Sequence, residues 1–246
     1  MDLPARWNLE MEGTEMSRLR TGCAIFAVAV ISWDIFLSQP ANAGSMTLKD
    51  LINNKGSLTV GDKTFSNFMA FSSTPTGGAM AVDPGSITVS TLTANTDGPG
   101  LMFVSPMFFA TTGQTLSVLF TYTVSTVSGK PLIKDDSLDS TSLGRTGVGS
   151  RVSVSETTAT PFTSNLIFAS PTQSRTSDFS FFPTNLATVG VSSSVQFVGG
   201  TTDGSGATVG SFNERFSEVV PEPSSLVLAC CGVVMALGWW HRRMKR

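Results

Sequence analysis

The chain has 246 residues, and its 16 Lys and Arg residues against 18 Asp and Glu residues leave a net charge of −2. The basic residues of the segment 44–219 are scattered rather than clustered, which excludes binding to the phosphate backbone of a nucleic acid. The single histidine, His241, and all three cysteines lie outside this segment. Residues 44–219 therefore have no disulfide framework and no catalytic triad or zinc site that depends on histidine.

A secretory signal peptide is predicted within residues 1–43. The positive n-region contains Arg18 and Arg20, and an apolar h-region follows it at Cys23–Ile31. Ala41 and Ala43 are small residues at the two positions that a signal peptidase reads, so cleavage is expected after Ala43.

Translation from Met16 would give a signal of about 28 residues, which is within the usual length. The alternative is a retained N-terminal membrane anchor. It is disfavoured because the apolar stretch is short and because Asp34 is costly in lipid.

Residues 44–219 are predicted to form one mainly β domain. A short helix is expected over Thr47–Asn54, with Thr47 as its N-cap and Asp50 in its first turn. Beyond it, apolar and polar residues alternate in segments rich in Val, Ile, Thr and Phe, which is typical of strands. These segments are Ser57–Val60, Ile87–Leu92, Leu116–Val127, Arg151–Ser155 and Val189–Val198.

The order of strands and turns indicates an antiparallel β-sandwich, most like a jelly roll, because no amphipathic helices separate the strands as a parallel sheet would require. Pro131–Val148 is predicted to be the most mobile loop. In the strand at Leu116–Val127, one face is expected to be apolar and the other mostly polar and suited to water. The apolar face contains Leu116, Val118, Phe120, Tyr122 and Val124, and the polar face contains Ser117, Leu119, Thr121, Thr123 and Ser125. The core is expected to contain Phe65, Phe68, Phe71, Phe103, Phe108, Phe109, Phe120, Phe162, Phe168, Phe179, Phe181, Phe182, Phe197, Phe212 and Phe216.

Carboxylates are the only candidate catalytic groups of the domain. A glycoside hydrolase needs two of them at a fixed spacing across the scissile bond. The candidates for such a pair are Asp135, Asp136, Asp139, Asp178, Glu156 and Glu214. Most carboxylates are solvated surface charges, so glycoside hydrolysis ranks third, behind the two functions described below.

No cofactor or metal is expected. Lys134–Asp139 and Asp203–Gly206 offer oxygen atoms of the kind that calcium takes, but neither matches the helix-loop-helix pattern. The glycines of Gly204–Gly210 imitate a dinucleotide fingerprint without its βαβ context. Both glycine-containing segments are interpreted as turns.

A hydrophobic membrane segment is predicted near the C-terminus. Leu226–Trp240 contains no charged residue, and the predicted helix of residues 224–240 is followed by a basic tail at 241–246. The tail is expected to remain cytoplasmic, which places residues 44–219 on the far side of the membrane. Its charges are Arg242, Arg243, Lys245 and Arg246.

The order of these features resembles the PEP-CTERM sorting signal of Gram-negative bacteria. Val220-Pro221-Glu222-Pro223 precedes the hydrophobic segment and the basic tail, so the resemblance covers residues 220–246. The two prolines favour an extended, accessible backbone. The segment Gly56–Phe68 also resembles the start of a recurrent domain of such exported proteins. This second resemblance implies no activity and no catalytic residue.

The resemblance implies a substrate of an exosortase, a membrane protease that cuts near Pro-Glu-Pro and releases the domain. The expected function is that of a non-enzymatic cell-surface or extracellular-matrix protein, transiently anchored in the bilayer. Its expected partners are signal peptidase, the exosortase and the lipid bilayer, with exopolysaccharide as a further candidate. A carbohydrate-binding module is the alternative, disfavoured because Tyr122 is the lone tyrosine and residues 44–219 lack tryptophan.

Overall fold

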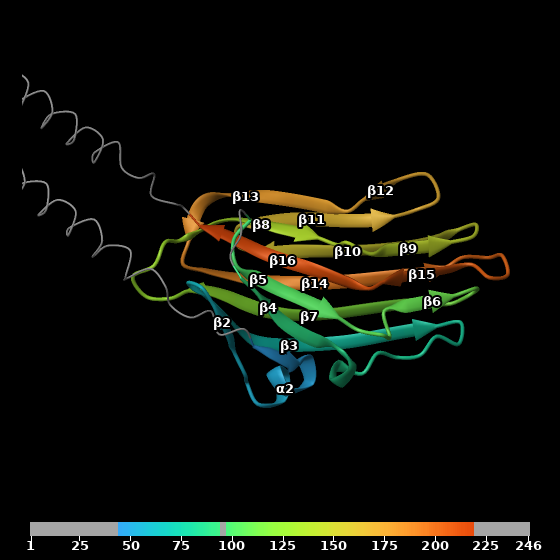
Figure 1. The fold of residues 1–246 in the computed structure, drawn as a ribbon, viewed down its shortest axis with the longest axis horizontal. Helices are drawn as coiled ribbons and strands as arrows, with labels where there is room; N and C mark the ends of the chain where they lie inside the picture. The colour runs from blue at the N-terminus through green and yellow to red at the C-terminus, as the bar shows by residue number, and fades with distance from the viewer. Residues whose placement is uncertain (1–43, 94–96, 219–246) are drawn as a thin grey trace, which may run out of the picture. The chain divides into compact units, whose positions relative to one another are not determined.

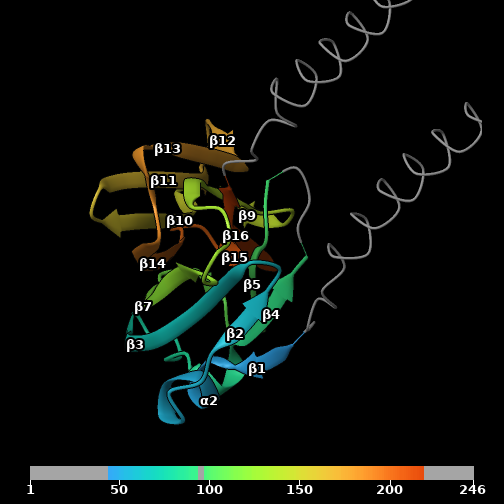
Figure 2. The same ribbon diagram turned by 90° about the vertical axis from the view of Figure 1, so that its left-hand side faces the viewer.

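The computed structural model describes residues 44–93 and 97–218, which fold into two packed antiparallel sheets (Figures 1 and 2). The mainly β, antiparallel sandwich predicted from the sequence is confirmed. The predicted segments at 1–43 and 219–246 lie outside the described residues. Within the described part, no helix has the length and apolar character needed to cross a bilayer.

The first sheet has six strands, in the order β1-β4-β5-β16-β8-β13. Their bounds are β1 Ser45–Thr47, β4 Thr88–Leu92, β5 Gly100–Val104, β16 Ser211–Glu218, β8 Ile133–Asp139 and β13 Ser177–Leu186. Strand β16 is paired on both sides, with β5 and with β8. The last strand of the described residues is therefore held in the interior of its sheet.

The second sheet has seven strands, in the order β12-β11-β10-β14-β7-β3-β2. Their bounds are β12 Ser174–Arg175, β11 Phe162–Ala169, β10 Ser150–Ala159, β14 Thr188–Gly199, β7 Thr115–Thr126, β3 Lys63–Thr76 and β2 Leu58–Val60. A small third sheet has the order β6-β15-β9. It contains β6 Phe109–Thr111, β15 Gly206–Val209 and β9 Leu143–Thr146.

The short helix predicted over Thr47–Asn54 is present as α2, Leu48–Asn53. The Thr47 side chain accepts a hydrogen bond from the Asp50 N–H at 3.1 Å, which caps the helix as predicted. Leu48 and Leu51 are buried in the core on its inner side. A single 3₁₀ turn, Pro84–Ser86, precedes β4.

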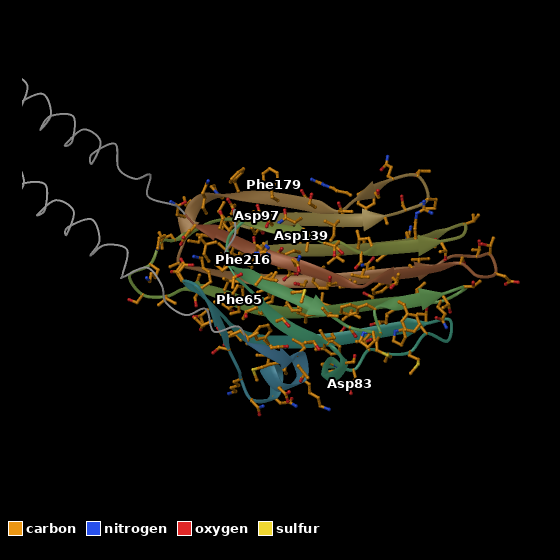
Figure 3. All side chains as sticks on the ribbon, in the orientation of Figure 1. Phe65, Asp83, Asp97, Asp139, Phe179 and Phe216 are labelled. Atoms are coloured by element: carbon orange, nitrogen blue, oxygen red, sulfur yellow. The ribbon has the colours of Figure 1, made fainter. Side chains whose placement is uncertain are left out.

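All five predicted strands are present, and β7 buries the predicted face, with Leu116 and Tyr122 each 2% exposed and Phe120 fully buried. The core joins both sheets through aromatic pairs. The ring centroids of Phe103 and Phe120 are 4.9 Å apart, and those of Phe65 and Phe216 are 6.0 Å apart. Phe65 and Phe216 are labelled in Figure 3. Each pair takes one ring from each sheet, so these contacts hold the two layers together.

Two predictions are corrected by the structure. The segment Pro131–Val148, predicted as one mobile loop, contains strands β8 and β9, because the acidic residues after Ile133 alternate between the interior and the outer face. Four phenylalanines predicted for the core are instead exposed, since they stand on outward-facing strand positions or at a hairpin turn. They are Phe109, Phe162, Phe179 and Phe181, and Figure 3 shows Phe179 on β13.

Candidate functional site

The most unusual feature of the interior is a cluster of three carboxyl groups. Asp136 comes from β8, Glu156 from β10 and Glu214 from β16, so the cluster draws on both sheets. All three side chains have no exposed surface. Buried carboxyl groups are rare in a domain of this size unless they are paired or protonated.

Strand alternation explains why these acids point inward. Glu156 follows Val152 and Val154 at every second position of β10, and all three side chains are buried. Glu214 lies between the buried rings of Phe212 and Phe216 on β16 in the same way. The direction of each side chain is therefore fixed by the apolar residues of its strand.

Hydrogen bonds satisfy this cluster unevenly. Glu214 accepts hydrogen bonds from the Tyr122 hydroxyl and, at 2.6 Å, from the Ser193 hydroxyl. Asp136 accepts one at Oδ2 from the Thr163 hydroxyl at 3.1 Å, whereas its Oδ1 has no partner in the described structure. Both side-chain oxygens of Glu156 are buried without a partner there.

Burial raises the pKa of every acid in this cluster, because transfer out of water disfavours the charged form. The pKa of Glu214 rises to about 7 and that of Asp136 to about 6, with burial as the main cause in each. The pKa of Glu156 rises well above its ordinary value through burial and then through the nearby Glu214 and Asp136. Burial therefore favours the protonated form of all three acids relative to the same groups in water.

The six candidate carboxylates are thus divided by the fold. Asp136, Glu156 and Glu214 come together, but in a closed interior that a polysaccharide does not reach in this structure. Asp139 accepts a hydrogen bond from Asn213 at 2.7 Å, and Asp178 accepts one from the Leu166 N–H at 2.9 Å. Asp135 faces Phe181 across the β8–β13 pair.

The acidic segments that offered oxygen atoms for calcium are likewise separated. Lys134–Asp139 belongs to strand β8 and not to a turn, so Asp136 points inward while its neighbour Asp135 does not. Across residues 44–93 and 97–218, no three acidic, histidine or cysteine side chains are grouped to hold a metal ion. Asp203 and Gly204 form a turn between β14 and β15, as expected. The interpretation of Gly204–Gly210 as a turn is wrong for most of that segment, because Gly206–Val209 is strand β15.

A groove lies on the outer face of the seven-stranded sheet, with a volume of about 400 Å³. Cross-strand pairing places its residues in two rows. In the first row, Met69 of β3 faces Thr121 of β7, Thr121 faces Ser192 of β14, and Ser192 faces Thr157 of β10. This row crosses four strands and presents three hydroxyl groups.

The second row of the groove contains small residues. Thr123 faces Gly190, and Ala159 of β10 faces Phe162 of β11. Phe162 is 75% exposed and Met69 is 53% exposed, so each raises an apolar wall above the lower floor at Gly190 and Ala159. Asn67 completes the lining, which contains no charged side chain.

Sequence reasoning missed this groove because it depends on the register of five strands. The signal that was available is Gly190, the second residue of the predicted strand Val189–Val198, since a glycine within a strand often marks a close approach or an open space. The sorting and signal-peptidase residues, from Ala41 and Ala43 to Val220–Pro223 and the basic tail, lie outside the described residues.

No family model and no curated protein matches the chain. Among solved structures, the enzymatically active domain of tailspike protein 4 from bacteriophage CBA120 is similar at a TM-score of 0.23 and 12% sequence identity. The match covers 60% of this chain and 19% of the tailspike chain. A similarity at this level carries no argument about fold or activity.

Proposed function

We propose that the chain is a non-enzymatic surface or matrix protein of a Gram-negative cell envelope, exported by a signal peptide and sorted by a C-terminal PEP-CTERM signal. One observation carries the proposal: the sandwich occupies the interval between the two predicted targeting segments. Strand β1 begins at Ser45, two residues after the predicted cleavage site, and β16 ends at Glu218, two residues before Val220.

The hydrogen bonds of Gly44 support the predicted N-terminus of the mature protein. Its backbone nitrogen donates to the Thr91 hydroxyl at 3.0 Å, and its carbonyl accepts from the Thr91 N–H at 3.0 Å. A free amino group at Gly44 retains hydrogens to donate, so cleavage after Ala43 is compatible with both contacts.

The strand order supports the finer proposal of a jelly-roll arrangement. Eight strands alternate between β5-β16-β8-β13 in one sheet and β7-β14-β10-β11 in the other. In chain order the sequence passes from one sheet to the other except at the β10–β11 hairpin. This pattern is that of two interleaved Greek keys, a scaffold used by structural and binding proteins as well as enzymes.

The buried acids favour a non-enzymatic role over the hydrolase alternative. General acid and base groups must lie within hydrogen-bonding reach of the substrate. Asp136, Glu156 and Glu214 have no exposed surface, and the outer carboxylates Asp139 and Asp178 are engaged in hydrogen bonds with their own fold. We therefore assign the cluster to the interior of the scaffold.

Expression of the full chain in a host with and without an exosortase tests the sorting proposal. Intact-mass measurement of membrane and medium fractions should reveal a released form from Gly44 to about Pro221 only when the exosortase is present. Substitution Glu222→Ala within the motif should block release, whereas Ser225→Ala, three residues later, is the matched control. A product that stays in the membrane with Arg246 intact in every host would overturn the proposal.

A further inference from the structure

We propose that the groove on the outer face of the seven-stranded sheet binds a segment of an uncharged polysaccharide. The site consists of the hydroxyl row Thr121-Ser192-Thr157, the low floor at Gly190 and Ala159, and the walls formed by Met69 and Phe162. This inference goes beyond the proposed sorting, and the two can fail separately because binding does not require processing.

The floor of the groove has an open space that packing does not require. Gly190 lies within strand β14, and a Cβ added there would meet no atom within 4 Å. Glycine within a strand lowers stability relative to a residue with a side chain. Since neither a contact nor a left-handed backbone demands glycine here, the absent side chain leaves room for a ligand.

Strand β3 is distorted where it forms the opposite wall. Its pairing with β7 shifts register on both sides of Met69. Asn67 and Ala70, the residues beside these shifts, have φ angles of 54° and 52°, which non-glycine residues rarely adopt. Bulges of this kind redirect side chains and cost free energy that the rest of the fold must offset. Here they bring Asn67 and Met69 into the groove lining.

The chemistry of the lining selects an uncharged, hydroxyl-rich ligand. The Thr121 hydroxyl donates to the Met69 carbonyl at 3.3 Å, and the Thr157 hydroxyl donates to the Ser192 carbonyl at 3.5 Å. Each hydroxyl oxygen keeps acceptor lone pairs, so a ligand must supply donors. The hydroxyl groups of a sugar supply such donors.

The two walls complement the other surface of a sugar. Phe162 and Met69 are apolar and exposed on opposite sides of the floor, where they can cover the C–H faces of a pyranose ring. An acidic polysaccharide or a phosphate finds no cation in the lining. An extended peptide finds no free strand edge, because the groove lies over the face of paired strands. A neutral glycan satisfies both the hydroxyl row and the apolar walls.

The test measures retention of the full chain, purified in a detergent without a sugar headgroup, in gels that contain dextran, mannan, β-glucan or alginate. We expect retention by at least one neutral polymer and none by alginate. Gly190→Ile should fill the floor and weaken retention about tenfold or more, and Phe162→Ala should weaken it about three- to tenfold. Gln196→Ile is the matched control, since Gln196 is on the same strand and face but outside the groove.

Circular dichroism melts of the three variants separate loss of binding from loss of fold. Gly190→Ile should melt no lower than the unsubstituted chain, because its Cβ meets open space. Retention by alginate alone, equal retention of Gly190→Ile and the unsubstituted chain, or no retention by any neutral polymer would overturn the inference. A chain that binds a neutral polymer but is never released by an exosortase would leave the groove assigned and reject the sorting proposal.

Discussion

The hydroxyl of Tyr122 on β7 donates a hydrogen bond to Oε2 of Glu214 on β16, across the interior of the sandwich. The two residues are 92 positions apart in the sequence and belong to different sheets. Burial and the neighbouring Glu214 carboxyl both raise the pKa of Tyr122 well above its ordinary value. Tyr122 therefore remains the donor at every physiological pH.

Tyr122→Phe should destabilise the fold by about 1 to 3 kcal/mol at pH 7, because the substitution removes one of the two side-chain donors of a buried carboxyl group. Urea denaturation of the full chain in detergent, followed by circular dichroism, measures the loss. Ser117→Ala, on the outer face of the same strand, is the control and should change stability by less than about 0.5 kcal/mol. Equal effects of the two substitutions would contradict a structural role for the hydrogen bond.

Stability should fall as pH rises from about 4.5 to 7. The pKa of Glu214 is raised from 4.5 to about 7 in the folded state, so the folded chain binds more protons than the unfolded chain within this window. The stabilisation that Glu214 contributes is fully present below about pH 4.5, and it is lost as the pH rises through the folded-state pKa of about 7. Asp136, with a pKa raised to about 6, and Glu156 act in the same direction.

Urea midpoints at pH 5, 6, 7 and 8 measure this dependence, which for Glu214 alone amounts to about 3 kcal/mol at most. Glu214→Gln carries no ionisable proton and should reduce the slope of the midpoint against pH between pH 5 and 7, leaving the smaller dependence due to Asp136 and Glu156. A midpoint that rises with pH through this range would show that the acids are ionised and paired in the folded chain.

Glu156→Met should stabilise the fold by about 1 to 3 kcal/mol at pH 8, because both carboxyl oxygens of Glu156 are buried without a partner and methionine fills a similar volume. Thermal melts at pH 5 and pH 8 measure the gain, which should be smaller at pH 5. The matched substitution Glu214→Met removes a carboxyl that has two donors and should not stabilise. A lower melting temperature for Glu156→Met would reveal an unidentified partner of Glu156.

Alanine substitutions at two glycines of β14 should have opposite effects on the stability of the fold. A Cβ at Gly199 would lie 1.7 Å from the Thr111 carbonyl oxygen, so Gly199→Ala should cost about 3 kcal/mol or more through displaced backbone. A Cβ at Gly190 meets open space, so Gly190→Ala should gain about 0.5 to 1 kcal/mol. Thermal melts of the two variants and of the unsubstituted chain, measured in parallel, compare their stabilities. A loss for Gly190→Ala would mean that its floor is less open than the geometry indicates.

Local patterns were sufficient to predict the short helix, five strands and the sandwich class. The buried face of β7 is visible in the alternation that includes Leu116, Phe120 and Tyr122. The same alternation, extended by one residue past the predicted segment Arg151–Ser155, places Glu156 inside. A charged residue ordinarily ends a buried run, so the local pattern alone does not predict a buried Glu156.

The groove and the longest strand could not be predicted in this way. Strand β3, Lys63–Thr76, contains two breaks in register, so its period-2 pattern is lost near Met69. The groove further depends on which residues of β7, β14 and β10 face one another, and register between distant strands has no local signature. The exposed position of Phe162 follows from the β10–β11 hairpin and not from its hydrophobicity.

The position of β16 has a mechanical consequence for a protein held by the residues that follow Glu218. A pull along this strand loads its ladders with β5 and with β8 in shear, so the bonds on both sides must yield together. Near the point of load, the Lys63 ammonium nitrogen lies 3.6 Å from Oε2 of Glu218 and ties the strand end to the opposite sheet. A load applied at this end of β16 would therefore reach strands of both sheets.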